Sequence, residues 1–193
     1  TALVIDPVDG RLPPRTETAI EAAAVRRAYV EEHRYDSYEN RSTGDRCIMG
    51  FNAGPPMRSS AYNNNVMIFQ SPGYVVILNE MVHNARIIPI GDTVHPPLLQ
   101  YSGVSRGHWE GETLVIDVTA QVPDTWLDSS GNHHSVNMHV EERYTAIGPN
   151  NIMYEATITD PTVFTRPWTM RVVQRRIPDY EFWEWACHEG ERD

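Results

Sequence analysis

Three of the eight histidines lie within seven residues of one another, at His133, His134 and His139. Imidazole is the side chain that titrates nearest neutral pH, and it is also the commonest metal ligand. Asp128 precedes the cluster, and a nearby carboxylate can fix the tautomer of an imidazole and raise its basicity. The spacing predicts an acid–base site in which His134 and His139 are the base and acid and Asp128 holds one of them.

Two other interpretations of the cluster stay open. In the segment 138–147, alternation places His139, Glu141 and Arg143 on one face of a strand, and Met138, Val140, Glu142 and Tyr144 on the other. The first alternative makes the charged face a solvated one, with His139 simply exposed. The second is a copper or zinc site, but no spacing typical of zinc sites places three ligands together. We therefore predict no metal ligands and no cofactor.

A second group of reactive side chains occurs at Glu80, His83 and Arg86. Arg86 alternates with Ile87, so it is expected to point inward, where its guanidinium can bind a carboxylate, with Glu80 supporting it. The alternative is an exposed hairpin with an ordinary ion pair. The predicted catalytic set is thus His134, His139, Asp128, Glu80 and Arg86, and the predicted substrate-binding set is His83, Asn65, Trp126, Tyr154 and Glu142.

Several chemistries are excluded by what the sequence lacks. All sixteen basic residues are arginine, so neither a lysine Schiff base nor a phosphate-loop lysine can form. Gly103-Val-Ser105-Arg-Gly107 matches the serine-hydrolase elbow pattern, but that elbow needs a helix after it, and a β-hairpin follows here. The formal charge of −10 argues against nucleic acids and anionic membranes as partners. We expect a small-molecule partner and no membrane insertion, and the oligomeric state, including a homo-oligomer, is left open.

The two cysteines, Cys47 and Cys187, match no metal-binding spacing. We predict a disulfide between them, and the alternative is a pair of free buried thiols. The chain starts at Thr1, as a mature protein does after removal of a signal peptide. Disulfides persist in oxidising compartments, so together these features predict an exported, periplasmic or extracellular protein.

The order of elements predicts a single domain over 1–193. Residues 1–62 comprise a Pro-rich arm, one helix at 16–40 capped by Thr16, and an irregular segment. From residue 66 the apolar period changes to 2. Strands are expected at 66–70, 74–80, 85–90, 100–109, 113–118, 138–147, 152–159, 168–177 and 180–187.

Eight or nine sequential antiparallel strands would leave two open edges in a flat sheet. Closure into an up-and-down β-barrel over 63–193, with a lipocalin or calycin-like fold, removes those edges. A β-sandwich is the alternative. The histidine cluster follows the long connection 119–137, and long loops on a rigid scaffold commonly carry functional residues.

Several long motifs resemble a large family of exported bacterial proteins. They run from Arg106 to Asp117 (RGHWEGETLVID), from Thr125 to Ser135 (TWLDSSGNHHS), from His139 to Arg143 (HVEER) and from Cys187 to Asp193 (CHEGERD). The resemblance covers nearly the whole chain and implies export and importance of His134 and His139, but no activity. The Trp109–Ile116 hairpin is similar to those of lipocalin and fatty-acid-binding barrels, which implies a fold and not a function.

Overall fold

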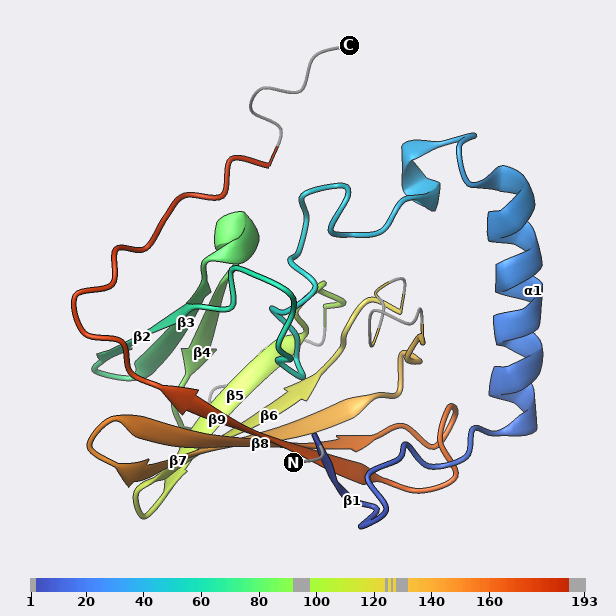
Figure 1. Ribbon diagram of the computed structural model, residues 1–193. Coiled ribbons are helices and arrows are strands. Elements are labelled where there is room, and N and C mark those ends of the chain that lie inside the picture. The colour runs from blue at the N-terminus through green and yellow to red at the C-terminus, as the bar shows by residue number, and fades with distance from the viewer. Residues whose placement is uncertain (1–2, 92–97, 124, 126, 128–131, 188–193) are drawn as a thin grey trace.

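The computed structural model describes residues 3–91, 98–123, 125, 127 and 132–187 (Figure 1). The chain is mainly β, with two antiparallel sheets and one α-helix in the described residues. The prediction of a mainly β fold is confirmed. The described strands form no closed barrel, so the predicted closure over 63–193 is not seen.

The larger sheet has six strands in the order β1-β9-β8-β7-β6-β5. Four of its antiparallel pairings join strands that are consecutive in sequence, and only the pairing of β1 with β9 is not. The β5–β6 and β7–β8 pairs are short hairpins, whereas longer connections join β6 to β7 and β8 to β9. Its strands are β1 (Val4–Asp6), β5 (Val104–Glu110), β6 (Thr113–Thr119), β7 (His139–Gly148), β8 (Asn151–Thr159) and β9 (Trp168–Arg175).

The smaller sheet is formed by β2 (Val66–Ser71), β3 (Tyr74–Asn79) and β4 (Ala85–Pro89) in that order. The turn between β2 and β3 contains Gly73, whose φ of 80° is readily available to glycine alone. A short 3-10 helix, η2 (Met81–His83), connects β3 to β4. All three strands were expected to within one residue at each end, because each is bounded by turn residues.

The two sheets meet at the end of β4, where Ile90 bridges to Gly107 in β5 and the Gly91 amide donates to the Gly107 carbonyl at 3.0 Å. A Cβ at position 107 would lie 2.6 Å from the terminal methyl of Ile90, so glycine lets this side chain pack directly on the β5 backbone. The core lies between the sheets, which bury Ile77 and Ile88 from one side and Ile116, Val140 and Tyr154 from the other.

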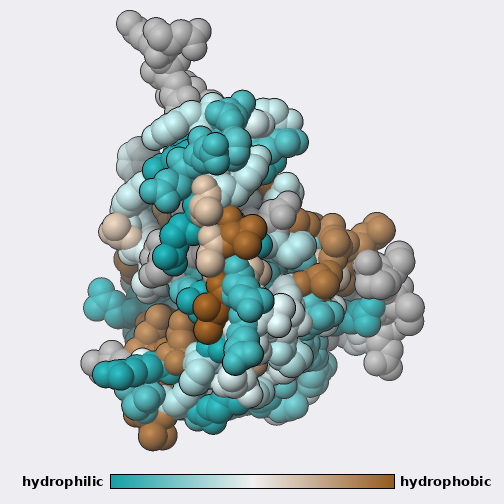
Figure 2. Space-filling model, turned by 90° about the vertical axis from the view of Figure 1, so that its right-hand side faces the viewer, coloured by the Kyte–Doolittle hydropathy of each residue, from teal (hydrophilic) through white to brown (hydrophobic). Residues whose placement is uncertain are grey.

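Helix α1 (Glu17–His33) is shorter than the predicted 16–40, although Thr16 caps it as expected, accepting from the Ala19 amide at 3.1 Å. The chain continues as the 3-10 helix η1 (Tyr38–Asn40). In Figure 1 α1 stands beside the sheets, and none of its residues is buried. Figure 2, which views this side, shows hydrophobic residues mixed with hydrophilic ones, and Val25 and Tyr29 are more than half exposed.

The expected last strand at 180–187 is not a strand. This segment runs as an extended, unpaired chain along one side of the molecule (Figure 1). Its described contacts include hydrogen bonds to Glu80 from the Tyr180 hydroxyl and the Trp183 amide and stacking of Trp185 on Tyr62. Cys187 also forms a disulfide with Cys47 across a Cα–Cα distance of 6.0 Å. The predicted disulfide is confirmed, and it fixes a chain that no sheet pairing holds.

Candidate functional site

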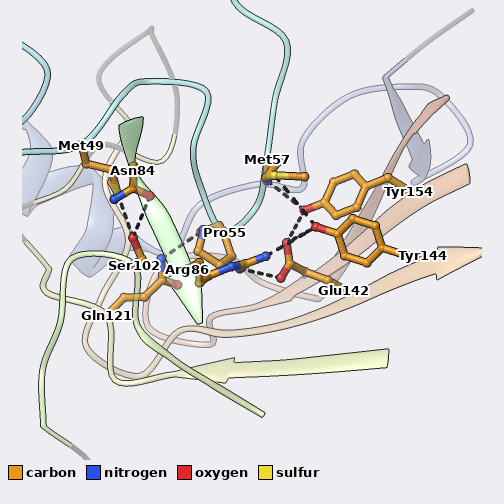
Figure 3. Close-up of polar contacts among 10 residues, drawn as sticks. All are labelled: Met49, Pro55, Met57, Asn84, Arg86, Ser102, Gln121, Glu142, Tyr144 and Tyr154. Atoms are coloured by element: carbon orange, nitrogen blue, oxygen red, sulfur yellow. Dashed lines mark hydrogen bonds and ion pairs between the residues drawn. The ribbon is translucent and has the colours of Figure 1, made fainter. Parts of the chain in front are cut away.

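A buried polar cluster joins the two sheets (Figure 3). Nη1 of Arg86 on β4 lies 2.6 Å from Oε2 of Glu142 on β7, although the pair lacks the alignment of a hydrogen bond. The Tyr154 hydroxyl donates to Glu142 at 2.8 Å and accepts from the Met57 amide at 2.8 Å. Arg86 and Tyr144 approach at 3.4 Å. Alternation along β4 and β7 places these side chains inward, as the sequence predicted for Arg86 and Glu142.

The electrostatics of this cluster stabilise its present charge state. Burial is the largest single influence and lowers the pKa of Arg86, but attraction to Glu142, together with the smaller contributions of Tyr144 and Tyr154, outweighs it, so that the net pKa is raised. Burial, followed by the charge of Glu142, raises the pKa of Tyr144 and of Tyr154 well above the usual 10. The guanidinium therefore stays protonated and both phenols stay neutral. The carboxylate that Arg86 binds is supplied by the protein itself.

Glu80 does not contact Arg86 in any described interaction and instead anchors the C-terminal segment. Its carboxylate accepts from Asn65 Nδ2 at 2.7 Å, from the Tyr180 hydroxyl at 2.5 Å and from the Trp183 amide at 3.4 Å. Burial raises the pKa of Glu80, but these hydrogen bonds outweigh it and leave the pKa lowered. Glu80 therefore holds residues 180–183 against the body of the protein.

The two histidines predicted to act together have separate surroundings. His139 points outward from β7, its side chain is 40% exposed, and Nε2 lies 3.0 Å from Oδ1 of Asp117 on the neighbouring strand β6. His83 is also exposed, at the end of η2. His134 is buried. The described contacts thus place His134 and His139 on different faces and bring neither of them to Arg86.

His134 has defined neighbours through both ring nitrogens. Nδ1 lies 3.0 Å from the Ser135 carbonyl, which can only accept, so Nδ1 carries a hydrogen. Nε2 lies within hydrogen-bond reach of the hydroxyl of Thr125. That hydroxyl also lies 3.1 Å from the Val122 carbonyl. Thr125 is buried as well, so the imidazole and the hydroxyl meet away from bulk water.

His134 and Thr125 line a pocket of about 390 Å³ between the irregular segment 42–58 and the loop that follows β6. Its walls are mainly apolar, and polar groups lie at a few places, among them Asp45, Arg58 and Gln121. Gln121 is buried and donates from Nε2 to the Pro55 carbonyl at 2.9 Å (Figure 3), leaving Oε1 without a donor among the described residues. The apolar walls include Met49, Phe51, Pro55, Pro56 and Leu127. A mostly apolar cavity of this size with a few convergent polar groups is typical of small-molecule sites.

Other predicted site residues lie elsewhere. Asn65 and Tyr154 line a different pocket, between β2 and β9. Asp128 and Trp126 lie outside the described residues. In the described part of the chain, no group of three or more His, Cys, Asp or Glu side chains is arranged to hold a metal ion. No described helix is both long and apolar enough to cross a membrane.

The sequence interpretation did not identify Thr125, Gln121 or Tyr144. The alternation in 138–147 could have identified Tyr144, because Tyr144 lies on the same buried face of the strand as Glu142, two residues earlier. No such signal exists for Thr125 and Gln121. They belong to an irregular loop, and only the path of that loop brings Thr125 to His134 and Gln121 to the segment 42–58.

Comparison of the chain with models of known families, with curated proteins and with solved structures finds no match. The family resemblance of the motifs therefore stays a prediction, and the site is interpreted from its own geometry.

Proposed function

We propose that the protein binds a small, mainly apolar organic molecule in the pocket that contains His134. The observation that carries the proposal is the pocket itself: about 390 Å³, with apolar walls and a buried imidazole, hydroxyl and amide oxygen. Such a site binds a ligand through apolar contact and orients it through a few hydrogen bonds. Gln121, which lines the pocket, has a buried amide oxygen that no described donor satisfies.

The contacts of the charged residues favour binding over the expected acid–base enzyme. Catalysis by the predicted set needs Arg86 to face a substrate and Glu80 to support it. Arg86 instead pairs with the buried Glu142, and Glu80 is hydrogen-bonded to Asn65 and Tyr180. His139 faces outward, against Asp117. These side chains have structural partners, so their presence in the chain is no longer an argument for catalysis.

The proposal includes an exported location and an open, lipocalin-like barrel. The Cys47–Cys187 disulfide supports export, because such bonds persist in oxidising compartments. The isolated bridge between Ile90 and Gly107, although parallel, supports the barrel, since it makes the strand order continuous from β2 to β9. An open barrel would leave its loop end free to form a ligand pocket.

One observation favours a second function, a cofactor-independent acid–base enzyme that uses the same pocket. The His134 ring lies within hydrogen-bond reach of the Thr125 hydroxyl, and both are buried. An imidazole beside a hydroxyl is the arrangement by which a general base activates a nucleophile. In this case His134 is the base, and the reaction is a hydrolysis, elimination or isomerisation of the bound molecule.

Binding is tested with the neutral fluorescent probe N-phenyl-1-naphthylamine. We expect saturable fluorescence enhancement, weakened roughly fivefold by Phe51→Ala, because the loss of about 1 kcal/mol of apolar contact corresponds to that factor. Phe69→Ala is the matched control, since Phe69 is 50% exposed, compared with 47% for Phe51, and lines neither pocket. Equal affinities for the two variants would contradict binding in this pocket.

The two functions are separated by what happens to the ligand. Native mass spectrometry of freshly purified protein identifies a co-purified molecule, which is then added back and recovered. Recovery of unchanged molecule supports binding alone. Turnover that falls at least about a hundredfold in His134→Gln, with probe binding retained, would establish the enzyme.

A further inference from the structure

A second pocket of about 350 Å³ lies between the two sheets, at their outer edges. Val66 and Met67 of β2 form one side, residues 172–175 of β9 form the other, and Tyr180 and Phe182 of the C-terminal segment contribute to the lining. It differs from the His134 pocket in all its described lining residues except Arg58. Nothing in the proposed function uses it.

Asn52 and Asn79 line this pocket, and each has a buried amide oxygen without a described donor. Asn52 is 4% exposed, and its Nδ2 donates to the Asn63 carbonyl at 2.7 Å, while its Oδ1 receives no hydrogen bond. Asn79 is 2% exposed, and its Oδ1 is likewise unpaired in the described structure. Buried acceptors are almost always paired in native proteins. A ligand that supplies hydroxyl or N–H donors would satisfy both oxygens.

The charge of the lining is opposite to that of the protein. The chain carries a formal charge of −10, yet the described lining contains Arg58, Arg175 and Arg176 and no carboxylate. Arg175 and Arg176 are exposed, and in the described residues their side chains form no ion pair. Guanidinium groups bind carboxylates strongly and repel cations. The arginines therefore argue against a cation on the two amide oxygens and favour an anionic group at the mouth.

Two buried carboxylates contact this lining from behind: Glu142, which accepts from Tyr154, and Glu80. The Glu80 oxygens accept from Asn65 and Tyr180, which both line the pocket, and from the Trp183 amide. Glu80 is 1% exposed, so it lies behind the wall rather than in the pocket. Its hydrogen bonds take up its acceptor capacity and leave the arginines at the mouth to interact with a ligand.

We infer that this pocket binds a small polyhydroxylated carboxylate, such as a sugar acid, with hydroxyl groups donating to Asn52 and Asn79 and the carboxylate facing Arg175 and Arg176. The apolar walls from Val66, Met67 and Phe182 fit the carbon face of a sugar ring. The site is a second binding function and does not depend on what the His134 pocket holds.

The test is isothermal titration calorimetry of the whole, disulfide-bonded chain with sodium glucuronate. Glucose, which lacks the charge, and acetate, which lacks the hydroxyl groups, are each expected to bind at least about tenfold more weakly, since each loses one of the two sets of contacts. Absence of glucuronate binding up to about 20 mM would overturn the inference, because that concentration exceeds the Kd of even a millimolar site. If acetate binds as tightly as glucuronate, the pocket is a general anion site, and the inference is likewise overturned.

Variants locate the binding. The double variant Arg175→Gln, Arg176→Gln should weaken glucuronate at least about tenfold. The control, Arg26→Gln with Arg27→Gln, makes the same charge change on exposed positions of α1 and should leave binding unchanged. Asn79→Leu should weaken glucuronate and glucose alike by at least about tenfold while the protein remains folded by circular dichroism. If the two arginine pairs have equal effects, the carboxylate does not bind here and the inference fails.

Discussion

Replacement of Glu142 by glutamine tests whether the Arg86–Glu142 pair is structural. Glutamine has nearly the shape of glutamate, and its amide oxygen can still accept from the Tyr154 hydroxyl. What it removes is the negative charge 2.6 Å from Arg86 Nη1. Arg86 is only 5% exposed and cannot shed its proton, so a full positive charge remains buried without a counter-ion.

The size of the effect follows from that uncompensated charge. Removing one partner of a buried ion pair typically costs about 3–5 kcal/mol. For a domain of 150–250 residues, each kcal/mol lowers Tm by about 2–4 °C, so we expect Glu142→Gln to lower Tm by roughly 6–20 °C. Glu141→Gln is the matched control. It makes the same change at the next residue, on the outer face, where Glu141 is 41% exposed and pairs loosely with Arg143 at 3.5 Å, so Tm should hardly change.

The assay is thermal and urea unfolding monitored by circular dichroism at neutral pH with the disulfide intact. The double variant Arg86→Met, Glu142→Leu should recover most of the loss, since replacing both partners by apolar residues leaves no buried charge. A loss below about 1 kcal/mol in Glu142→Gln would refute the reasoning, because Arg86 would then be able to reach water. Probe binding in the His134 pocket should survive in any variant that stays folded, because neither Arg86 nor Glu142 lines that pocket.

Three further predictions follow from the same contacts. Replacing Cys47 and Cys187 together by serine should cost about 4–5 kcal/mol in the chain-entropy model, because the bond closes a loop over a sequence separation of 140, and reductant should destabilise the wild type but not the variant in urea unfolding. Since the pKa of Glu80 is lowered in the folded state, its charge contributes stability that is complete above the ordinary value of 4.5 and is lost as pH falls through the lowered pKa. Glu80→Gln should therefore lose less stability between neutral and acid pH than the wild type, and identical pH profiles would contradict this. The pKa values of Tyr144 and Tyr154 are raised well above 10, so fewer than nine tyrosines of the native protein should ionise near pH 10 in an absorbance titration. The number that ionise near pH 10 should be the same in Tyr144→Phe, because Tyr144 does not contribute to it.

Most strands could be predicted from the sequence because each depends on local information. The alternation in 138–147 placed Glu142 and Tyr144 on the face opposite Glu141 and Arg143, and burial in the structure follows that division. Gly73 and Gly111 marked turns that require positive φ. The disulfide between Cys47 and Cys187 was likewise predicted, since they are the only two cysteines in the chain.

The errors arose where local preference and tertiary contact disagree. The aromatic alternation of 180–187 is typical of a strand, but no neighbouring strand pairs with this segment, and hydrogen bonding of Tyr180 to Glu80 holds it instead. The helix was expected to reach residue 40 but ends at His33. It buries no residue, and in the described structure its packing against the core is through the half-buried Ala19 at its N-terminal end, so no core packing extends its C-terminal end beyond its own propensity.

The sequence by itself determined the β-rich class, the inward or outward direction of side chains in 138–144 and of Arg86, and the cysteine pairing, because these depend on period, turn residues and count. Only the tertiary structure decided which reactive groups meet. It paired Arg86 with Glu142, turned Glu80 toward Tyr180, left His139 against Asp117 and placed His134 beside Thr125 in a pocket. The physical reason is that strand alternation fixes only the face on which a side chain lies. The partner on that face is set by how the two sheets pack and by the path of irregular loops, and neither leaves a periodic pattern in the sequence.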